Sequence, residues 1–216
     1  MSLDLPVTAT KSGKTDAILD WLQMISGVAL IIFVFMHMTL VSSVLVNPEI
    51  MDAIAHKYEA NYMAQVGGPL LFLLFLFHFY LAARKIPFRL EGQKTIWAHA
   101  KMLNHRDTWL WIVQAASAMI ILIMGSIHMW AVLSDLPITA ARSAARMQSG
   151  PWVYFYLILA PLVVLHVVAG LYRIAVKWGV AKDYSRDKLN KIAIGLGAFF
   201  LVLGLATIVR YMTLAV

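Results

Sequence analysis

The sequence contains no cysteine in its 216 residues. Without thiolates the chain offers no ligands for an iron–sulfur cluster of the usual kind, no disulfide and no attachment site for c-type haem. It also lacks a glycine-rich nucleotide fingerprint. Charged residues are scarce, at 13% of the chain, whereas 61% of the residues are hydrophobic. These features exclude thiol redox chemistry and a nucleotide-binding domain, and they indicate an all-α membrane protein.

Acidic residues are few, and none lies inside a long hydrophobic run. The 11 Asp and Glu residues are outnumbered by 18 Lys and Arg, which gives a formal net charge of +7. This excess falls in short connections between apolar runs, so it reflects membrane topology rather than binding of nucleic acid. The absence of buried acids also means that no acid relay for protons crosses the bilayer.

Five hydrophobic runs are long enough to span a membrane, because about 20 apolar residues cross roughly 30 Å of hydrocarbon. We expect a five-helix integral membrane bundle, forming one domain over residues 1–216. The predicted spans are residues 21–46, 61–83, 108–134, 152–176 and 192–212.

Lys and Arg are unevenly distributed between the two sides of this bundle. The N-terminal stretch and the second and fourth connections carry 14 of the 18, and the other side carries Lys57, Arg142, Arg146 and Arg210. Positive residues favour the cytoplasmic side. We therefore predict a multi-pass protein of the bacterial inner membrane, with a cytoplasmic N-terminus and an external C-terminus. The basic connections suit anionic lipid headgroups and an acidic partner surface equally well.

Four histidines lie inside four different hydrophobic runs: His37, His78, His128 and His166. An ionisable residue inside a bilayer is costly and indicates function. At 1.5 Å per residue, His37 and His128 lie about 24 and 28 Å from the inner ends of their helices, whereas His78 and His166 lie about 9 and 16 Å from theirs. Two depths with two imidazoles each predict two b-type haems that carry electrons across the membrane.

A weak internal repeat supports this interpretation. In the first and third runs a Gln stands 14 residues and a Ser 11 residues before the histidine, as Gln23 and Ser26 and as Gln114 and Ser117. These intervals are close to four and three helical turns, so the three side chains share one helix face. Close packing of helices on small residues is the alternative explanation. Methionines at helical spacing are interpreted as core residues, and His56, His99 and His105 as solvated side chains of connections or membrane edges.

Several motifs together carry a family resemblance. They are Asp20-Trp21-x-Gln23 with His37, His78 followed by Arg84-Lys85-x-Pro87, His105-x-Asp107, Trp111-x2-Gln114, Gly125-Ser126-x-His128, Arg146-Met147 and His166-x3-Gly170-Leu171-Tyr172-Arg173-x3-Lys177-Trp178-Gly179. Over residues 16–211 the chain resembles the dihaem cytochrome b membrane anchors of the succinate:quinone oxidoreductases. It is most similar to the anchors of fumarate reductases that have one large membrane subunit.

The resemblance implies a role for each candidate residue. His78 and His166 would ligate the inner haem, and His37 and His128 the outer haem. The positions that line the inner haem are matched by Gln23, Trp111 and Lys177, and Lys177 would neutralise a propionate there. We add Ser26 as a lining residue because of its place in the repeat. Arg146 would be a charge partner of the outer haem or of the outer loop.

The resemblance also implies partners. A flavoprotein subunit that reduces fumarate and an iron–sulfur subunit would dock on the cytoplasmic basic connections, and a dimer of the whole complex is expected. The lipid-soluble substrate would be menaquinol, whose oxidation releases protons and calls for a proton acceptor. Glu59 is the nearest match to the acid that serves this role in the family, and a solvated loop acid is the alternative.

One departure from some dihaem relatives concerns proton movement. They carry a buried acid two residues before the fourth histidine, where this chain has Val164. We therefore expect protons from quinol to leave at the outer face while electrons move inward, so that turnover moves charge across the membrane.

Two other functions remain compatible with the pattern. The first is a cytochrome b subunit of another quinone-linked oxidoreductase, of the formate dehydrogenase or hydrogenase type. The second is a haem-free transporter or membrane scaffold with polar histidines. A helix bundle by itself does not distinguish them.

Overall fold

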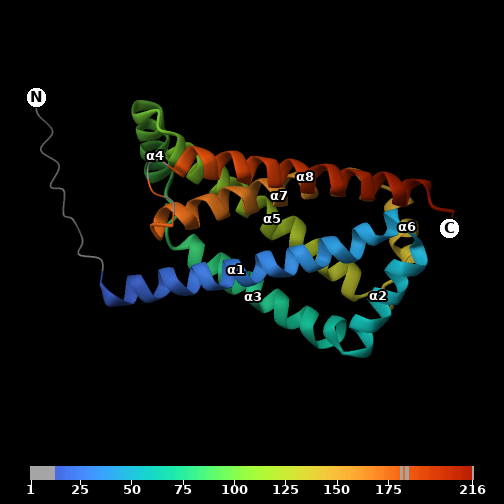
Figure 1. Cartoon of the computed structure of the whole chain (residues 1–216). Coiled ribbons are helices and arrows are strands. Elements are labelled where there is room, and N and C mark those ends of the chain that lie inside the picture. Colours follow the sequence, from blue (N-terminus) through green and yellow to red (C-terminus); the bar gives the residue numbers. More distant parts are fainter. Residues whose placement is uncertain (1–12, 181, 183–184, 216) are drawn as a thin grey trace, which may run out of the picture.

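The computed structural model describes residues 13–180, 182 and 185–215. Over these residues the chain forms eight α-helices, five of which are long and apolar enough to cross a membrane, as the sequence predicts (Figure 1). The long helices are α1 (Lys14–Ser42), α3 (Gly68–Ala83), α5 (Arg106–Leu133), α7 (Trp152–Lys177) and α8 (Arg186–Thr213). A π-helical stretch, η2 (Met63–Gly67), precedes α3 and brings the second span to 21 residues.

Two of the long helices begin earlier than the hydrophobic pattern predicts. Helix α1 begins at Lys14 rather than Trp21, and α8 begins at Arg186 rather than at residue 192. The hydropathy edge marks where apolar side chains start, whereas backbone hydrogen bonding continues through polar residues that favour helix. The helices therefore extend beyond the predicted spans at the ends that carry charge.

Three further helices lie in segments that the sequence analysis treats as connections: α2 (Pro48–Ala60), α4 (Leu90–Leu103) and α6 (Ala140–Gln148). A short 3₁₀ turn, η1 (Ser43–Leu45), joins α1 to the Asn47 that precedes α2. The Asn47 side chain accepts a hydrogen bond from the Glu49 N–H, and Thr139 accepts one from Arg142 N–H, so both helices start at a side-chain cap. His56 and His99 consequently lie on helices, α2 and α4, and both are exposed there.

The long helices pack as two pairs that follow the order of the chain. Helix α1 packs against α3, which we call the first helical pair, and α5 packs against α7, the second helical pair. Helix α8 covers α7, where a Cβ added at Gly197 would come 2.7 Å from Cγ2 of Val168. The four histidines are thus divided evenly, two on each helical pair.

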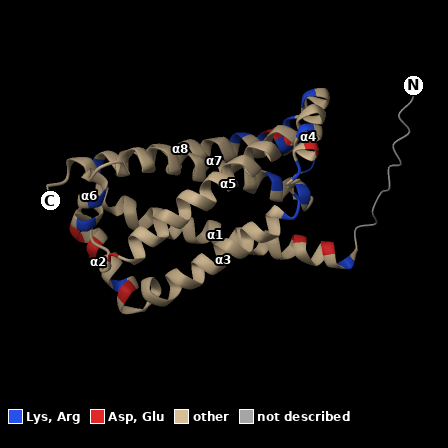
Figure 2. Cartoon of the chain, turned by 180° about the vertical axis from the view of Figure 1, so that it is seen from behind, with Lys and Arg blue, Asp and Glu red and all other residues tan. Residues whose placement is uncertain are grey.

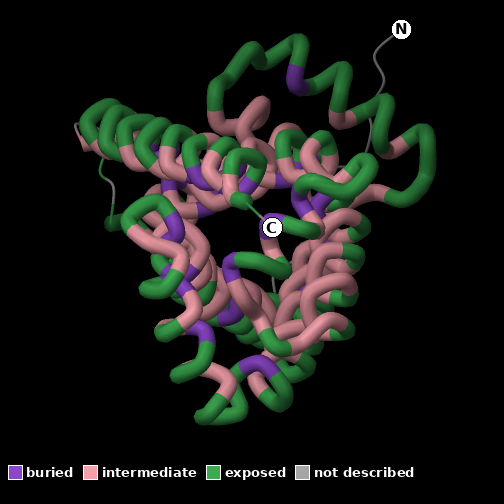
Figure 3. The backbone as a smooth tube through the Cα atoms, turned by 90° about the vertical axis from the view of Figure 1, so that its right-hand side faces the viewer, coloured by how far each residue is buried: buried purple, intermediate pink, exposed green. Residues whose placement is uncertain are grey.

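Charged residues gather at the two ends of the bundle, and the helices between them are almost free of charge (Figure 2). One end carries α4 and the start of α1 and is called the α4 end; the other carries α2 and α6 and is called the α6 end (Figure 1). The buried apolar core lies at the α6 end, where α1, α2, α6 and α8 meet, and consists of Leu40, Val44, Met51, Ala55, Ala140, Ala144, Met147, Ile208 and Tyr211. Seen along the bundle, much of the rest of the helices is exposed or only partly buried (Figure 3).

Candidate functional site

Two of the four histidines meet towards the α6 end of the bundle. His37 on α1 and His128 on α5 face one another with ring centroids 5.7 Å apart and planes inclined by 71°. The His37 ring also stacks on Phe33, one turn earlier on the same helix, at 5.7 Å. Two imidazoles from different helical pairs are therefore close enough to share one ligand between them.

His128 is also hydrogen-bonded to an aromatic hydroxyl that the sequence analysis did not single out. Its Nδ1 lies 3.1 Å from the hydroxyl oxygen of Tyr156 on α7. The Arg146 guanidinium also interacts with this Tyr156 hydroxyl. A polar connection therefore runs from Arg146 on α6 to an imidazole inside the bundle.

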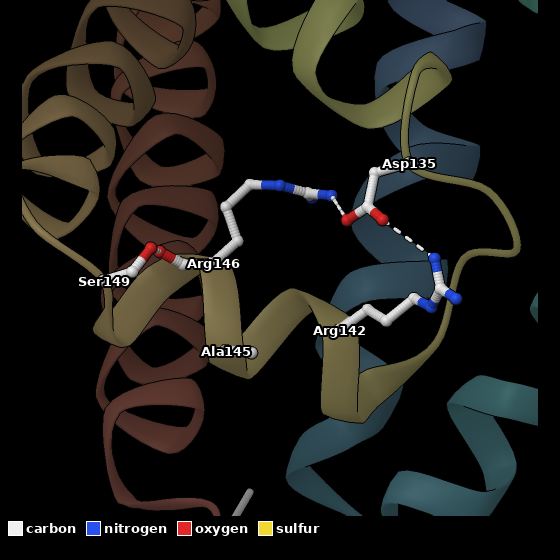
Figure 4. Close-up of a pocket in the computed structure, with 5 residues that line it drawn as sticks. All are labelled: Asp135, Arg142, Ala145, Arg146 and Ser149. Atoms are coloured by element: carbon white, nitrogen blue, oxygen red, sulfur yellow. Dashed lines mark hydrogen bonds and ion pairs between the residues drawn. The ribbon is translucent and has the colours of Figure 1, made fainter.

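Arg146 lies in a pocket at the α6 end, lined by Asp135, Arg142, Ala145, Arg146 and Ser149 (Figure 4). Its Nη2 lies 2.5 Å from Oδ2 of Asp135, and Nη1 of Arg142 lies 2.8 Å from Oδ1 of the same carboxylate. The Arg146 side chain is 13% exposed and that of Asp135 is 45% exposed, so the guanidinium is shielded from water but its carboxylate partner is not. Arg146 therefore pairs with an acid that lies between α5 and α6.

The other two histidines each contact a serine of the repeat. Oγ of Ser26 on α1 lies 2.9 Å from Nδ1 of His78 on α3 and donates to the Gln23 carbonyl at 3.0 Å. A hydroxyl has only one proton, and we assign it to the carbonyl, which can only accept. His78 Nδ1 must therefore carry a proton and donate it to the serine oxygen.

The second helical pair repeats this arrangement. Oγ of Ser117 on α5 lies 3.1 Å from Nδ1 of His166 on α7 and donates to the Gln114 carbonyl at 3.0 Å. The same Nδ1 lies 3.2 Å from that carbonyl, which can only accept. Both rings consequently have a protonated Nδ1 and a free lone pair on Nε2, which is the tautomer that binds a metal.

Ion pairs join α1, α3 and α7 at the α4 end. Asp20 accepts from Lys85 Nζ at 2.5 Å and from Lys177 Nζ at 2.6 Å, and it also pairs with Arg84. Burial lowers the pKa of Lys85, although the hydrogen bond to Asp20 opposes this shift. Lys177, expected to neutralise a propionate, thus stands in a cluster with more cations than acids.

Gln23 lies one turn after Asp20 on α1, and Trp111 lies on α5. Gln23 is one turn before Ser26 and supplies the carbonyl that orients it. Trp111 is half-buried on α5, one turn before Gln114. The Gln114 side chain accepts a hydrogen bond from Arg173, so α5 and α7 are also held together by a polar contact that the repeat alone did not predict.

Glu59 lies in the last turn of α2 and is half-buried. Its Oε1 accepts a hydrogen bond of 2.6 Å from the backbone N–H of Ile138, in the segment between α5 and α6. The acid therefore joins two connections at the α6 end, the end at which His37 and His128 meet. It is not a freely solvated loop residue.

The residues present fit a haem at each level. In the part of the chain that the structure describes, no three His, Asp or Glu side chains cluster as a bare metal ion would need, whereas the rings of His37 and His128 meet as a pair. A Cβ added at Gly27 would lie 2.9 Å from Cε1 of His78, so the absence of a side chain at position 27 leaves space for this ring. Arg84 Nε and Nη1 are buried without a hydrogen-bond partner among the described residues. Donors of this kind suit the carboxylates of a haem.

Sequence reasoning missed four residues of this arrangement. Ser117 was visible in the repeat, and Asp20 and Arg84 stood in the motifs of the resemblance, but none was selected as a site residue. Tyr156 carried no local signal, because its partner His128 lies on a different helix.

Comparison with known proteins shows the family of this chain. Residues 91–205 match the family described as succinate dehydrogenase/fumarate reductase transmembrane subunit. The fumarate reductase cytochrome b subunit of Wolinella succinogenes is 32% identical over 214 residues, which cover 93% of this chain and 84% of the relative. That of Helicobacter pylori strain J99 is 34% identical over 202 residues, which cover 89% of this chain and 79% of the relative. The chain therefore belongs to the family of succinate dehydrogenase and fumarate reductase transmembrane subunits.

Proposed function

We propose that this chain is the dihaem cytochrome b anchor of a quinol:fumarate reductase, or of a succinate dehydrogenase working in the opposite direction. The observation that carries the proposal is one ring-to-ring pair of imidazoles, beside two further imidazoles that serines hold in the same way. His37 and His128 face one another at 5.7 Å, and His78 and His166 each have Nδ1 bonded to a serine. Family membership favours this function over the formate dehydrogenase and hydrogenase alternative.

The four histidines are the residues that would hold the iron of two b haems. His37 and His128 would hold the outer haem, and His78 and His166 the inner one. When bound, the haems supply one-electron carriers that join a quinol site on one side of the membrane to an iron–sulfur subunit on the other. The chain holds their ligands at two levels on four helices.

The basic cluster at the α4 end is the proposed partner of the inner haem carboxylates. Arg84, Lys85 and Lys177 bring three positive charges, and Asp20 accepts a contact from each. Gln23, Ser26 and Trp111 complete the lining from α1 and α5. Arg146 at the α6 end would serve the outer haem, while Asp135 holds its guanidinium in place.

Menaquinol is the proposed substrate at the α6 end. Glu59 is half-buried there and its Oε1 accepts from Ile138 N–H, whereas its second carboxylate oxygen has no hydrogen bond to any of the described residues and would take a proton from quinol. No Asp or Glu lies in the interior of the spans. The proton would therefore leave to the outer face, and the electrons would travel inward.

The partners would bind at the opposite, α4 end. An iron–sulfur subunit and a flavoprotein that reduces fumarate would dock there, on the basic connections and on α4, because the cytoplasmic side carries the positive excess. In this arrangement the N-terminus is cytoplasmic and the C-terminus external, in a bacterial inner membrane. We expect two copies of the complex to associate, with no role for nucleic acid.

A reduced-minus-oxidised spectrum of the purified membrane complex, with haem quantified per chain, tests the proposal. Two low-spin b haems per chain, and reduction of both by a menaquinol analogue, are expected. Absence of haem from the purified chain would favour the transporter or scaffold interpretation. Co-purification with a molybdenum or nickel enzyme in place of a flavoprotein would favour the formate dehydrogenase or hydrogenase type.

A further inference from the structure

The serines of the repeat connect the two sets of histidines. We call His37 and His128 the α6-end level, and His78 and His166 the α4-end level. Ser26 stands 11 residues before His37 on α1, and Ser117 stands 11 residues before His128 on α5. Each helix that carries a histidine of the α6-end level therefore carries, about 16 Å lower, a hydroxyl for a histidine of the other level. In both cases the partner histidine lies on the other helix of the same helical pair.

The two levels differ in what holds Nδ1. At the α4-end level both Nδ1 atoms meet a serine oxygen whose own proton is used on a backbone carbonyl. At the α6-end level His128 meets the Tyr156 hydroxyl, and His37 has its stacking contact with Phe33. The α4-end imidazoles thus have the more uniform set of hydrogen-bond acceptors.

We propose that Ser26 and Ser117 are positioning residues for the inner haem. They fix the tautomer of His78 and His166, and they lower the redox potential of that haem. The inference rests on the proposed function, because it assigns a role toward a haem. Neither serine would touch the iron. Each would act through the imidazole that it orients.

The physical reason is ligand basicity. An acceptor on Nδ1–H draws the proton away from the ring and makes Nε2 a stronger electron donor, which stabilises the oxidised metal and lowers its potential. A serine that donates to a carbonyl is a better acceptor than an isolated hydroxyl, because hydrogen bonds in a chain polarise one another. The paired Ser–Gln carbonyl units therefore act in the same direction on both ligands.

The test is a redox titration of each haem in the purified complex, with low-temperature EPR of the ferric state. Ser26→Ala, Ser117→Ala and the double variant are compared with the wild type. We expect the potential of the inner haem to rise in each single variant and further in the double variant, with a changed EPR signal for that haem only. Ser→Thr at either position keeps the hydroxyl and is expected to restore the wild-type value.

Ser126→Ala is the matched control. Ser126 lies on α5 two residues before His128, and its hydroxyl donates to the Leu122 carbonyl at 2.6 Å. It contacts none of the four histidines through a hydrogen bond in the described structure, so neither haem should change. Loss of the inner haem alone in an alanine variant, restored by threonine, would also support the orienting role.

Three results would overturn the inference: unchanged potentials in the double alanine variant, an equal shift of both haems, or failure of threonine to restore the potential. If the alanine variants do not assemble, Ser26→Cys and Ser117→Cys keep the volume with a weaker acceptor, and the same selective rise is required of them. A wild-type complex without two haems would instead refute the proposed function, and this inference with it.

Discussion

Lys177 Nζ lies 2.6 Å from Oδ2 of Asp20, although 157 residues separate them in the chain. The contact joins the beginning of α1 to the last turn of α7, and Lys85 and Arg84 bring the end of α3 to the same carboxylate. One acid therefore holds three transmembrane helices together at the α4 end.

Replacing this acid should loosen the bundle. The Asp20 side chain is 20% exposed, so in Asp20→Asn Lys85 and Lys177 lose their counter-charge in a partly shielded place, and Arg84 keeps only Asp16, at 3.6 Å. We expect a loss of about 1–2 kcal/mol in stability, at the lower end of the range for breaking buried charged contacts. Thermal denaturation in detergent would measure it. The control is Asp187→Asn, an 87% exposed acid paired with Arg106, which should change little.

The pairing of the histidines gives a sharper test than any single substitution. His37→Ala and His128→Ala should each remove one haem, and the double variant should lose no more than either single one, because both residues serve the same centre. His37→Ala combined with His78→Ala should remove both. Pyridine haemochrome assays per chain would measure the ratio, with exposed His56→Ala as the control. Loss of both haems from the His37–His128 double variant alone would contradict the pairing.

Glu59→Gln should separate quinol oxidation from the rest of the complex. The amide oxygen can still accept from Ile138 N–H, so the fold should persist, whereas the proton acceptor is lost. We expect menaquinol-driven turnover to fall by roughly 100-fold or more. Fumarate reduction with an artificial dye donor and the haem spectrum should stay unchanged. Glu49→Gln, an exposed acid on the same helix, is the control; full quinol activity in Glu59→Gln would remove Glu59 from the mechanism.

Gly27→Ala should displace His78 without removing any polar group. The new methyl would lie 2.9 Å from Cε1 of the ring, closer than carbon atoms can approach, so the ring must move away from Ser26. We expect loss of the inner haem with the outer haem retained. Gly195→Ala on α8 is the matched control, because its added Cβ would meet nothing within 4 Å. Haem quantification and the EPR spectrum would distinguish the two variants.

Turnover should build a membrane potential in proteoliposomes. Protons released outside and electrons delivered inside leave the outside positive, and the spans contain no Asp or Glu in their interior to compensate. A potential-sensitive dye should respond to menaquinol and fumarate, and an uncoupler should abolish the response. Electroneutral turnover would show that protons cross by a path other than an acid relay of this chain.

The membrane spans were predictable, but their ends were not. The long apolar runs by themselves require transmembrane helices, since a backbone in lipid must satisfy its own hydrogen bonds. The true start of α1 at Lys14 lies outside the run because helix continues into polar residues. Helices α2, α4 and α6 were missed, since they are short and carry polar side chains that resemble loops.

The sequence by itself determined the class of molecule, the four histidines and their two depths, because composition and helical rise depend only on the order of residues. Only the tertiary structure decided that α1 packs on α3 and α5 on α7, and therefore which serine meets which histidine. It also decided that Tyr156 holds His128 and that Asp20 gathers three cations. Such contacts depend on how separate helices rotate and pack against one another, and no local pattern along the chain records that.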